Sequence, residues 1–392
     1  MANNKQQMTI GYLSPTNPFT DRKGWSGTYF STRQAIEDAG FKVEWVPSEE
    51  TGTFFKIEHR VLKMVHCLIY GRGIFDNSTM SSKLRVRYAN KQNLDKYDLI
   101  FVPGQSDVVA RLRTKTPIIR YSDATVALMI DYYWFNWSKK SIDDANNVEQ
   151  MAIDNSAVNL LSSQWAASSV INDYHASKDR VFVLSFGANI DDSKIVQAQV
   201  YQSGRLNVFF TGIDWERKGG EIAVNAIKKL RSDGVDAHLY ICGIRDLAQE
   251  IVDLDFVENL GFLDKNNPNE YQKYLNTWSK VHLLLLPTRA ECSAIVFNEA
   301  SAYGVPILST DTGGVSDYVF NDVNGWRMPL SASGDDYAIK IEEWIKTDKF
   351  SDLSASALNL YQTRNSWKAW GESFKKIVAN CKNKLNTYHN IW

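Results

Sequence analysis

The sequence predicts an α/β protein built from two doubly wound domains in tandem. Short apolar runs, each long enough for one buried strand, alternate with stretches of helical periodicity, which is typical of parallel sheets covered by helices. This alternation breaks at a polar stretch, residues 190–205, where the linker between the domains is expected, and then starts again. Several expected strands end in loops with glycine or acidic residues, and ligands bind at that end of a parallel sheet.

Composition narrows the classes of protein that fit the chain. Its 392 residues are 44% apolar and carry a net charge of −1, so large cores can form and no basic excess points to a nucleic-acid partner. The cysteines lie far apart, which suits reduced thiols in a cytoplasmic protein. The first residues, MANNKQQMTIGYLS, have no apolar signal core, and no run approaches the length of a membrane span.

In the first half of the chain, strands are expected at residues 8–14, 41–46, 97–104, 117–123, 158–163 and 181–186. Helices are expected at 28–39, 58–70, 82–93, 105–112 and 165–174, and an aromatic run at 132–137 is expected in helical surroundings. The order of strand, helix and strand at this spacing predicts right-handed crossovers and a parallel sheet.

Two strand ends in this half are candidate ligand sites. The loop at 14–27 brings Gly27 to the start of a helix, where phosphate or sugar binds readily, although glycine also serves plain turns. Asp123 stands at the carboxyl end of the fourth strand. It either binds a ligand there or caps the helix that follows.

The helices expected at 58–70 and 82–93 form the most basic part of the chain. Their cations and those of the intervening loop are Arg60, Lys63, Arg72, Lys83, Arg85, Arg87 and Lys91. These side chains form either an ordinary solvated helix face or a surface for anionic lipid or an acidic acceptor.

In the second half, strands are expected at 206–213, 237–242, 259–263, 281–286 and from 306 onward. Helices are expected at 220–230, at 271–278, in a run that ends at 304, and at 337–346. After residue 366, large apolar side chains recur at three- or four-residue spacing, which predicts an amphipathic helix packed on one or both domains; they are Trp367, Trp370, Phe374 and Ile377. The expected domains are 1–190 and 206–365, followed by the helix at 366–392.

Two adjacent cations follow the first strand of the second domain. Arg217 and Lys218 precede a glycine pair that opens a helix. Cations beside a helix N-terminus suit a diphosphate: Lys218 would act as a point charge, and Arg217 could bind two oxygens as a fork. The alternative is an ordinary surface Arg-Lys pair.

Two glutamates follow the strand at 281–286. Glu291 lies in the loop after the strand and Glu299 inside the next helix, so their reach differs and they do not form a simple acid/base dyad. Glu299 could bind two ribose hydroxyls and Glu291 the hydroxyls of a sugar; the alternative is two solvent-facing glutamates. Backbone N–H groups of Ser293, Ala294 and Ile295 would face the diphosphate at the helix N-terminus.

Two motifs carry a family resemblance. One is E-x7-E, present as Glu291-CSAIVFN-Glu299, and the other is FFTGIDWERKGG, which ends in the cations and the glycine pair. Shorter matches are WSGT, YDLIFVPG, YSDAT and FGAN, so the pattern spans nearly the whole chain. The chain resembles the retaining GT-B glycosyltransferases of family 4, a group that includes glycogen- and sucrose-synthase-like enzymes.

The resemblance implies two Rossmann-like domains that face a cleft, with a C-terminal helix that packs back. It implies a nucleotide-diphosphate-sugar as co-substrate, with UDP or GDP as its nucleotide, and no cofactor or catalytic metal. A hexose-type sugar would pass with retention to a hydroxyl of a glycan, a lipid-linked or a small-molecule acceptor, in polysaccharide biosynthesis. The expected localisation is the cytoplasm, and peripheral contact with the inner face of the membrane is left open.

The resemblance also assigns roles to residues. Glu299 would hold the ribose and Glu291 the transferred sugar, while Arg217 and Lys218 would hold the diphosphate. Gly27 would approach the donor phosphates or the acceptor. Glu291 and Lys218 are the catalytic candidates, joined by Asp123 as an anchor for a sugar or acceptor hydroxyl. The lone D-x-D sequence, Asp253-Leu254-Asp255, is interpreted as surface and not as a metal site.

Three positions depart from the pattern of this family. Many relatives have Gly-Arg where this chain has Gly212-Ile213, and Arg217 is the candidate replacement for that cation. Relatives often have Gly-Phe-Gly where Cys292-Ser293-Ala294 stands, and many have a histidine where this chain has Ser122-Asp123. Two other functions stay open at this point: an epimerase or hydrolase on the same fold, and a catalytically silent partner that binds a nucleotide sugar.

Overall fold

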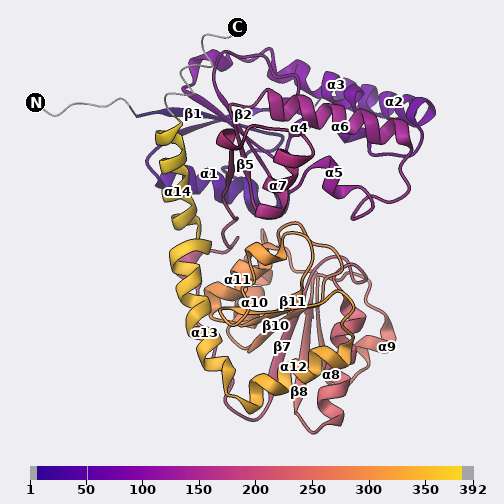
Figure 1. Ribbon diagram of the computed structural model, residues 1–392, viewed down its shortest axis with the longest axis vertical. Coiled ribbons are helices and arrows are strands. Elements are labelled where there is room, and N and C mark those ends of the chain that lie inside the picture. The colour runs from indigo at the N-terminus through magenta and orange to yellow at the C-terminus, as the bar shows by residue number, and fades with distance from the viewer. Residues whose placement is uncertain (1–6, 51, 382–392) are drawn as a thin grey trace, which may run out of the picture. The chain divides into compact units, whose positions relative to one another are not determined.

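The structure is a computed structural model that describes residues 7–50 and 52–381. These residues form two compact units: unit 1 holds 7–185 together with 370–381, and unit 2 holds 186–369. Each unit contains a six-stranded sheet in which all neighbouring strands are parallel (Figure 1). The prediction of an α/β fold with two doubly wound sheets is therefore confirmed.

The sheet of unit 1 has the strand order β2-β1-β3-β4-β5-β6. Its strands are β1 (Thr9–Ser14), β2 (Lys42–Pro47), β3 (Leu99–Pro103), β4 (Ile118–Ser122), β5 (Val158–Leu161) and β6 (Val181–Val183). All residues of β3 and β4 are buried, as expected for central parallel strands with helices on both faces. The strand order reverses between β1 and β3.

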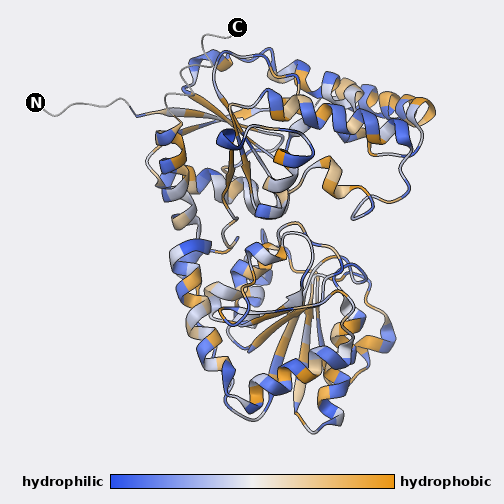
Figure 2. Cartoon of the chain, in the orientation of Figure 1, coloured by the Kyte–Doolittle hydropathy of each residue, from blue (hydrophilic) through white to orange (hydrophobic). Residues whose placement is uncertain are grey.

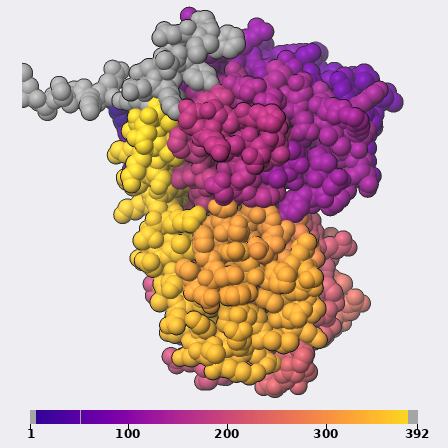
Figure 3. Space-filling view, viewed as in Figure 1, coloured from indigo at the N-terminus to yellow at the C-terminus, as the bar shows by residue number. Residues whose placement is uncertain are grey.

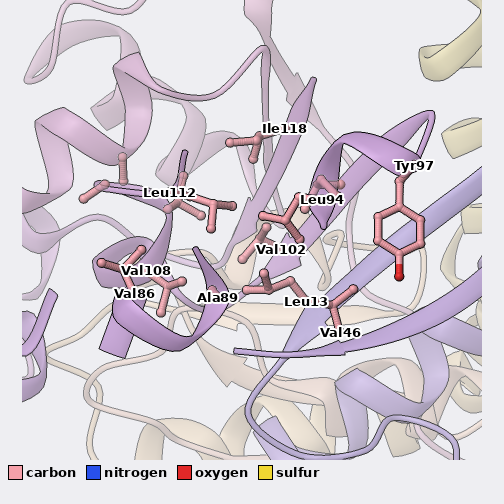
Figure 4. Close-up of a cluster of buried hydrophobic side chains, with 14 of the residues drawn as sticks. Leu13, Val46, Val86, Ala89, Leu94, Tyr97, Val102, Val108, Leu112 and Ile118 are labelled. Carbon is pink, nitrogen blue, oxygen red and sulfur yellow. The ribbon is translucent and has the colours of Figure 1, made fainter. Parts of the chain in front are cut away.

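The helices of unit 1 are α1 (Thr28–Asp38), α2 (Thr53–Tyr70), α3 (Thr79–Ala89), α4 (Ser106–Val109), α5 (Val126–Met129), α6 (Lys139–Asp154), α7 (Gln164–Asn172) and most of α14 (Trp367–Asn380). Short 3-10 turns are η1 (Gly24–Gly27), η2 (Phe75–Asn77), η3 (Leu94–Lys96) and η4 (Lys178–Arg180). One apolar core joins side chains of β1 to β4 to side chains of α3, α4 and α6 (Figure 4). This core fixes the three helices against the sheet.

The sheet of unit 2 has the strand order β12-β11-β10-β7-β8-β9. Its strands are β7 (Leu206–Thr211), β8 (Ala237–Cys242), β9 (Val257–Gly261), β10 (Leu283–Leu286), β11 (Ile307–Thr310) and β12 (Gly325–Met328). Its helices are α8 (Gly220–Ser232), α9 (Gln249–Val252), α10 (Pro268–Trp278), α11 (Ile295–Tyr303), α12 (Gly334–Lys346) and α13 (Lys349–Leu360), with short turns η5 (Asp192–Lys194), η6 (Val315–Asp317) and η7 (Tyr361–Asn365). The strand order reverses between β7 and β10.

Hydropathy follows this layering. The strands of both sheets are mainly apolar, whereas most helices alternate apolar and polar residues around their axis (Figure 2). Strand β10 consists of four fully buried leucines, so the loop that follows it starts from a rigid position. Among the described helices, none combines the length and the apolar character needed to span a bilayer.

The C-terminal helix α14 completes the core of unit 1. Trp370 and Phe374 are buried and stacked, with ring centroids 5.0 Å apart, and the Trp370 indole donates a hydrogen bond to the Tyr121 hydroxyl at 3.0 Å. Figure 3 shows the outward side of this helix in yellow. The apolar stripe ends on buried Val378, whereas Ile377 is half-buried. Residues 382–392 of the helix expected at 366–392 lie outside the described residues.

The expectation of helical surroundings for the aromatic run at 132–137 is wrong. These residues form a loop between α5 and α6. Asp131 and Asn136 have φ of 56° and 60°, which interrupts a right-handed helix, and the Trp134 and Trp137 rings stack with centroids 4.7 Å apart. The two left-handed residues thus end helical structure here, and the stacked tryptophan rings pack within the resulting loop.

The polar stretch at 190–205 lies within unit 2, and the chain passes from unit 1 to unit 2 between Ser185 and Phe186. The stretch is held by bonds to unit 2: the Asp191 N–H donates to the Tyr271 hydroxyl at 3.0 Å, and the Ala198 N–H donates to the Tyr303 carbonyl at 3.0 Å. The stretch is therefore a surface segment of unit 2, and its polar composition reflects its exposure to solvent.

Candidate functional site

The switch point of the unit 2 sheet lies between β7 and β10. From β7 the chain builds β8 and β9 on one side of the sheet, and from β10 it builds β11 and β12 on the other. Loops that leave such neighbouring strands at their carboxyl ends diverge and leave a crevice, where doubly wound sheets bind ligands. The loop 212–219 follows β7 and the loop 287–294 follows β10, so both predicted clusters of charge start from this point.

Glycine lets the two loops approach each other. Gly219 has a φ of 74°, and a Cβ atom there would lie 2.1 Å from the carbonyl oxygen of Pro287. The Arg289 N–H donates to the Arg217 carbonyl at 2.7 Å, which ties the loops together. Any side chain at position 219 would push the β7 loop away from the end of β10.

Lys218 and Glu291 form a buried ion pair across the switch point. Their side chains are 11% and 7% exposed, and the Lys218 ammonium donates a hydrogen bond to Glu291 Oε2. Arg217 Nη1 lies 3.9 Å from the same oxygen and donates to the Ala290 carbonyl at 3.1 Å. The structure thus brings together three of the predicted site residues, with two cations directed at one carboxylate.

Glu299 is held apart from this cluster, inside α11. It is 2% exposed; Lys265 Nζ donates to its Oε1 at 2.7 Å, and the Tyr274 hydroxyl donates to its Oε2. Burial, and then the charge of Glu299, raise the pKa of Tyr274 well above its ordinary value. The Tyr274 hydroxyl therefore stays protonated and remains a donor at neutral pH.

Lys265 and Tyr274 are functional candidates that sequence reasoning missed. They lie 34 and 25 positions from Glu299 along the chain, in the loop after β9 and on α10. Lys265 Nζ also lies 3.5 Å from the carbonyl oxygen of Asn189, in the FGAN segment. No local sequence pattern predicts contacts between residues so far apart. The one signal in the sequence was that Tyr274 falls on the apolar face of an expected helix.

The N-terminus of α11 is where the sequence predicts an anion. The helix starts at Ile295 with Ala294 as its N-cap, and no side chain caps it. The Ser293 hydroxyl donates to the Cys292 carbonyl at 2.8 Å. The Glu291 carbonyl accepts from the Gly314 N–H at 2.9 Å, which fixes the preceding loop. Ser293, Ala294 and Ile295 therefore lie at the first turn, and their contact with an anion stays a prediction.

Gly27 and Asp123 belong to unit 1. Gly27 is the N-cap of α1 at the β1/β3 switch point, with a φ of 89°, and Trp25 and Ser26 before it have φ of 48° and 57°. Left-handed residues other than glycine are strained and gather at functional sites. Asp123 follows β4, one strand further along. Burial raises the pKa of Tyr29 to about 12, and the charges of Asp107, Glu49 and, least, Asp123 add to this shift.

The D-x-D sequence takes part in surface contacts. Asp255 pairs with Arg231 at 2.8 Å, and Asp253 accepts a hydrogen bond from Gln249 at 2.7 Å. Across residues 7–50 and 52–381, no group of three or more His, Cys, Asp or Glu side chains is arranged to hold a metal ion. Whether the reaction needs a metal stays a prediction.

Comparisons with known proteins agree with this architecture. Residues 192–357 match the family described as glycosyl transferases group 1. The D-inositol 3-phosphate glycosyltransferase of Corynebacterium diphtheriae is 22% identical over 59% of this chain and 58% of its own length. The putative colanic acid biosynthesis glycosyltransferase WcaL of Escherichia coli is 25% identical over 74% of this chain and 73% of its own length. The first of these matches thus spans little more than half of its relative.

A solved structure extends the likeness to nearly the whole chain. Anabaena HepE, in complex with UDP and glucose, superposes with a TM-score of 0.59 at 14% identity, covering 95% of this chain and 100% of HepE. At this identity the likeness concerns the fold, which is GT-B. The resemblance identified from the motifs is thereby confirmed: residues 192–357 match the group 1 glycosyl transferases, and the fold is that of the GT-B enzymes.

Proposed function

We propose that the protein is a retaining glycosyltransferase that moves a hexose-type sugar from a nucleotide-diphosphate-sugar to an acceptor hydroxyl. The observation that carries the proposal is the buried contact of Lys218 with Glu291 at the β7/β10 switch point. At this point Lys218, a cation that suits a leaving diphosphate, lies next to Glu291, a carboxylate that suits sugar hydroxyls. The match of residues 192–357 to the glycosyl transferases group 1 supports the same chemistry.

Lys218 and Arg217 have the task of stabilising the departing diphosphate. Charge builds on that group as the bond from the sugar C1 to the phosphate oxygen breaks, and cations fixed in a buried site stabilise it strongly. Lys218 is held by Glu291, and Arg217 by the carbonyl of Ala290. Both cations are therefore positioned before the donor arrives.

Glu291 binds hydroxyls of the transferred sugar, and Glu299 binds the ribose of the nucleotide. To bind the ribose, the Glu299 carboxylate has to accept hydrogen bonds from two hydroxyls. Lys265 and Tyr274 donate to its two oxygens and so fix its orientation. Ser293, Ala294 and Ile295 add backbone N–H groups at the start of α11. In unit 1, Gly27 lines the donor phosphates or the acceptor, and Asp123 anchors a sugar or acceptor hydroxyl.

The proposed chemistry needs no protein nucleophile and no metal. The C1–O bond to the diphosphate breaks and the C1–O bond to the acceptor forms on the same face of the sugar. The acceptor hydroxyl proton passes to an oxygen of the departing diphosphate. Retention follows because attack and departure share one face.

The donor is a UDP- or GDP-sugar, and the setting is the assembly of a glycan or polysaccharide in the cytoplasm. HepE was solved with UDP and glucose, and WcaL carries the description putative colanic acid biosynthesis glycosyltransferase. The acceptor is a glycan, a lipid-linked or a small molecule with a free hydroxyl. The inositol phosphate in the names of other relatives marks one small-molecule acceptor to include in a panel.

A donor panel tests the proposal. UDP-, GDP-, ADP- and dTDP-sugars are incubated with candidate acceptors, with and without EDTA, and the anomeric configuration of the product is read by NMR. Transfer with retention in EDTA is expected. An inverted product or a strict need for a divalent metal contradicts the mechanism. Donor binding without hydrolysis or transfer identifies a silent partner, and an isomerised donor identifies an epimerase.

A further inference from the structure

Helix α2 exposes a row of large apolar side chains. Phe54, Ile57, Val61, Met64 and Leu68 are between 46% and 87% exposed, with Leu68 the most exposed. Their spacing of three and four residues places them on one face of the helix, here called the outer stripe. In Figure 1 this helix lies at the edge of unit 1, and its apolar residues stand out in Figure 2.

The opposite face of α2 already supplies the contacts that attach it to unit 1. The rings of His59 and His66 contact Phe75 of η2, with ring centroids 4.9 Å and 5.9 Å away. A surface helix normally has one apolar face and one polar face. Since the inner face attaches the helix, the outer stripe has no part in holding the fold, and contiguous exposed apolar surface of this kind marks an interaction site.

Cations flank the outer stripe. Lys56, Arg60 and Lys63 lie along one side of it and are exposed, and in the part of the chain that the structure describes they form no ion pair. On the other side, Glu58 is the only acid of α2, and Arg87 of α3 neutralises it at 2.6 Å. Positive charge therefore borders the apolar row on one side, and the other side is close to neutral.

The positive charge continues beyond Arg87. A cavity of about 800 Å³ beside α3 is lined by five cations and a single acid, Asp154. The cations are Lys83, Arg87, Arg111, Arg113 and Lys115. The chain as a whole has a net charge of −1, so this concentration of cations in one region of unit 1 is a local feature.

We propose that α2 docks on an anionic lipid bilayer. The outer stripe enters the boundary between headgroups and acyl chains, and the flanking cations bind the lipid phosphates. Apolar side chains on one face with Lys and Arg beside them are what such interfacial helices require. The proposal concerns attachment and stands independently of the sugar chemistry of unit 2.

A second copy of the chain fits this surface less well. Pairing two α2 helices through the outer stripe would bring the unpaired cations of both copies together, and like charges oppose that contact. The stripe also covers only two heptads, which is short for a stable helix pair. Anionic lipid instead provides the opposite charge.

Vesicle flotation of the full chain tests the proposal. Vesicles of phosphatidylcholine alone are compared with vesicles in which about one lipid in three is anionic phosphatidylglycerol. The wild type should bind the anionic vesicles, and less so as salt rises. Leu68→Ser and the triple variant Lys56→Gln/Arg60→Gln/Lys63→Gln should each weaken binding on the order of tenfold or more.

Matched controls remove equivalent groups elsewhere. Ile339→Ser removes an apolar side chain that is 60% exposed on α12, and Lys228→Gln/Lys280→Gln/Lys368→Gln removes three exposed cations of unit 2. Neither should change flotation. All replaced side chains are exposed, so unchanged thermal unfolding is expected and verifies that each variant is folded.

A fluorophore locates the contact directly. Cys67 lies on α2 and is exposed, whereas Cys242, Cys292 and Cys381 are buried, so a thiol-reactive, polarity-sensitive dye labels α2 selectively. Its emission should shift to the blue on anionic vesicles. The same dye on Ile339→Cys in a Cys67→Ser background should not shift.

Three results would overturn the proposal. One is flotation that is unchanged by Leu68→Ser and by the triple variant, and another is vesicle binding without a change in emission at Cys67. The third is a wild-type protein that does not bind vesicles, sediments as a dimer and becomes a monomer on Leu68→Ser. That result would make the outer stripe a self-association surface.

Discussion

At the scale of residues, the site depends on a buried ion pair that is costly to break. Lys218 and Glu291 are both largely withdrawn from water. Bringing two charges out of water costs several kcal/mol each, and their mutual attraction offsets that cost only while both are present. The pair therefore contributes little to net stability. Removing Glu291 leaves the buried Lys218 ammonium without this carboxylate, and removing Lys218 leaves Glu291 with the more distant Arg217, whose Nη1 lies 3.9 Å from its Oε2.

Breaking the pair should cost more than removing it. Lys218→Ala and Glu291→Ala should each lower the free energy of unfolding by about 3 to 5 kcal/mol, and Lys218→Met/Glu291→Leu by much less. Urea unfolding measures this. Lys139→Ala, at an exposed pair with Asp143, serves as the control and should change nothing measurable. Equal losses in the singles and the double would show that the pair is not coupled.

The same variants separate stability from chemistry. Donor turnover by Lys218→Met/Glu291→Leu should be abolished even where the protein is folded, and Lys218→Ala should lower kcat rather than only raise KM. If Lys218→Ala keeps wild-type kcat at a temperature where it is folded, the diphosphate is bound elsewhere.

Tyr274 should act on donor binding through Glu299. Tyr274→Phe removes one of the two donors to a buried carboxylate, and the loss of one such hydrogen bond should weaken UDP or GDP binding on the order of tenfold. Calorimetric titration measures it. Tyr303→Phe is the control, because its buried hydroxyl has no hydrogen-bond partner among the described residues, so its loss should leave binding unchanged. Equal affinities in all three proteins would remove Tyr274 from the site.

His282 should make unit 2 sensitive to acid. Burial lowers the pKa of His282, and its Nδ1 accepts the Asn207 N–H at 3.0 Å, so the folded state holds the ring neutral. The unfolded chain takes up a proton below about pH 6.5. Stability is therefore fully present above that pH and falls as the pH drops below it.

The measurement is urea unfolding at about pH 7.5 and about pH 5.5. His282→Gln keeps an acceptor for Asn207 but cannot titrate, so it should lose less stability than the wild type between the two values. His66 and His238 also have pKa values lowered by burial, so part of the acid dependence should persist. An identical pH dependence in variant and wild type would exclude His282.

At the scale of elements, loop geometry sets the site. The β7 loop presses on the end of β10 through Gly219, and that approach brings Lys218 to Glu291. The two charged side chains of the proposed site are thus positioned by a residue that has no side chain of its own.

Gly219→Ala should impair both fold and activity. The new Cβ meets the carbonyl of Pro287, so the loop has to move and Lys218 moves with it. Gly234→Ala is matched to it, with a φ of 93° and nothing within 4 Å of the added Cβ. The control should lose about 1 kcal/mol from its left-handed backbone alone. Gly219→Ala should lose more in urea unfolding and should lose donor turnover; equal losses would contradict a role for the close approach.

Most strands could be predicted from the sequence, because a parallel sheet buried on both faces demands continuous apolar runs. Strand β12 was missed, since three of its four residues are only partly buried and one of these is Arg327. Helix α13 was missed next to the predicted α12. The roles of Lys265 and Tyr274 required the fold, because they reach Glu299 from different elements, whereas Lys218 and Glu291 stood at strand ends that the alternation had already indicated.

At the scale of the whole molecule, unit 1 depends on a segment from the far end of the chain. Trp370 packs on Phe101 and Tyr121 with ring centroids 6.2 Å and 5.7 Å away. Trp370→Ala should therefore cost about 3 to 5 kcal/mol. Limited proteolysis should show unit 1 cut before unit 2 in the variant, while Lys376→Ala, at an exposed position of the same helix, should match the wild type. Simultaneous loss of both units would contradict this dependence.

The discontinuity of unit 1 also sets an order of events on the ribosome. Residues 7–185 emerge first, then all of 186–369, and only afterwards the aromatic residues of α14. At about 5 to 20 residues per second, synthesis of residues 186–369 takes on the order of ten to forty seconds. During that time residues 7–185 lack the Trp370 and Phe374 rings that complete their core. The unit made second can thus finish folding first, and the nascent N-terminal half is the part of this protein that a chaperone would have to shield.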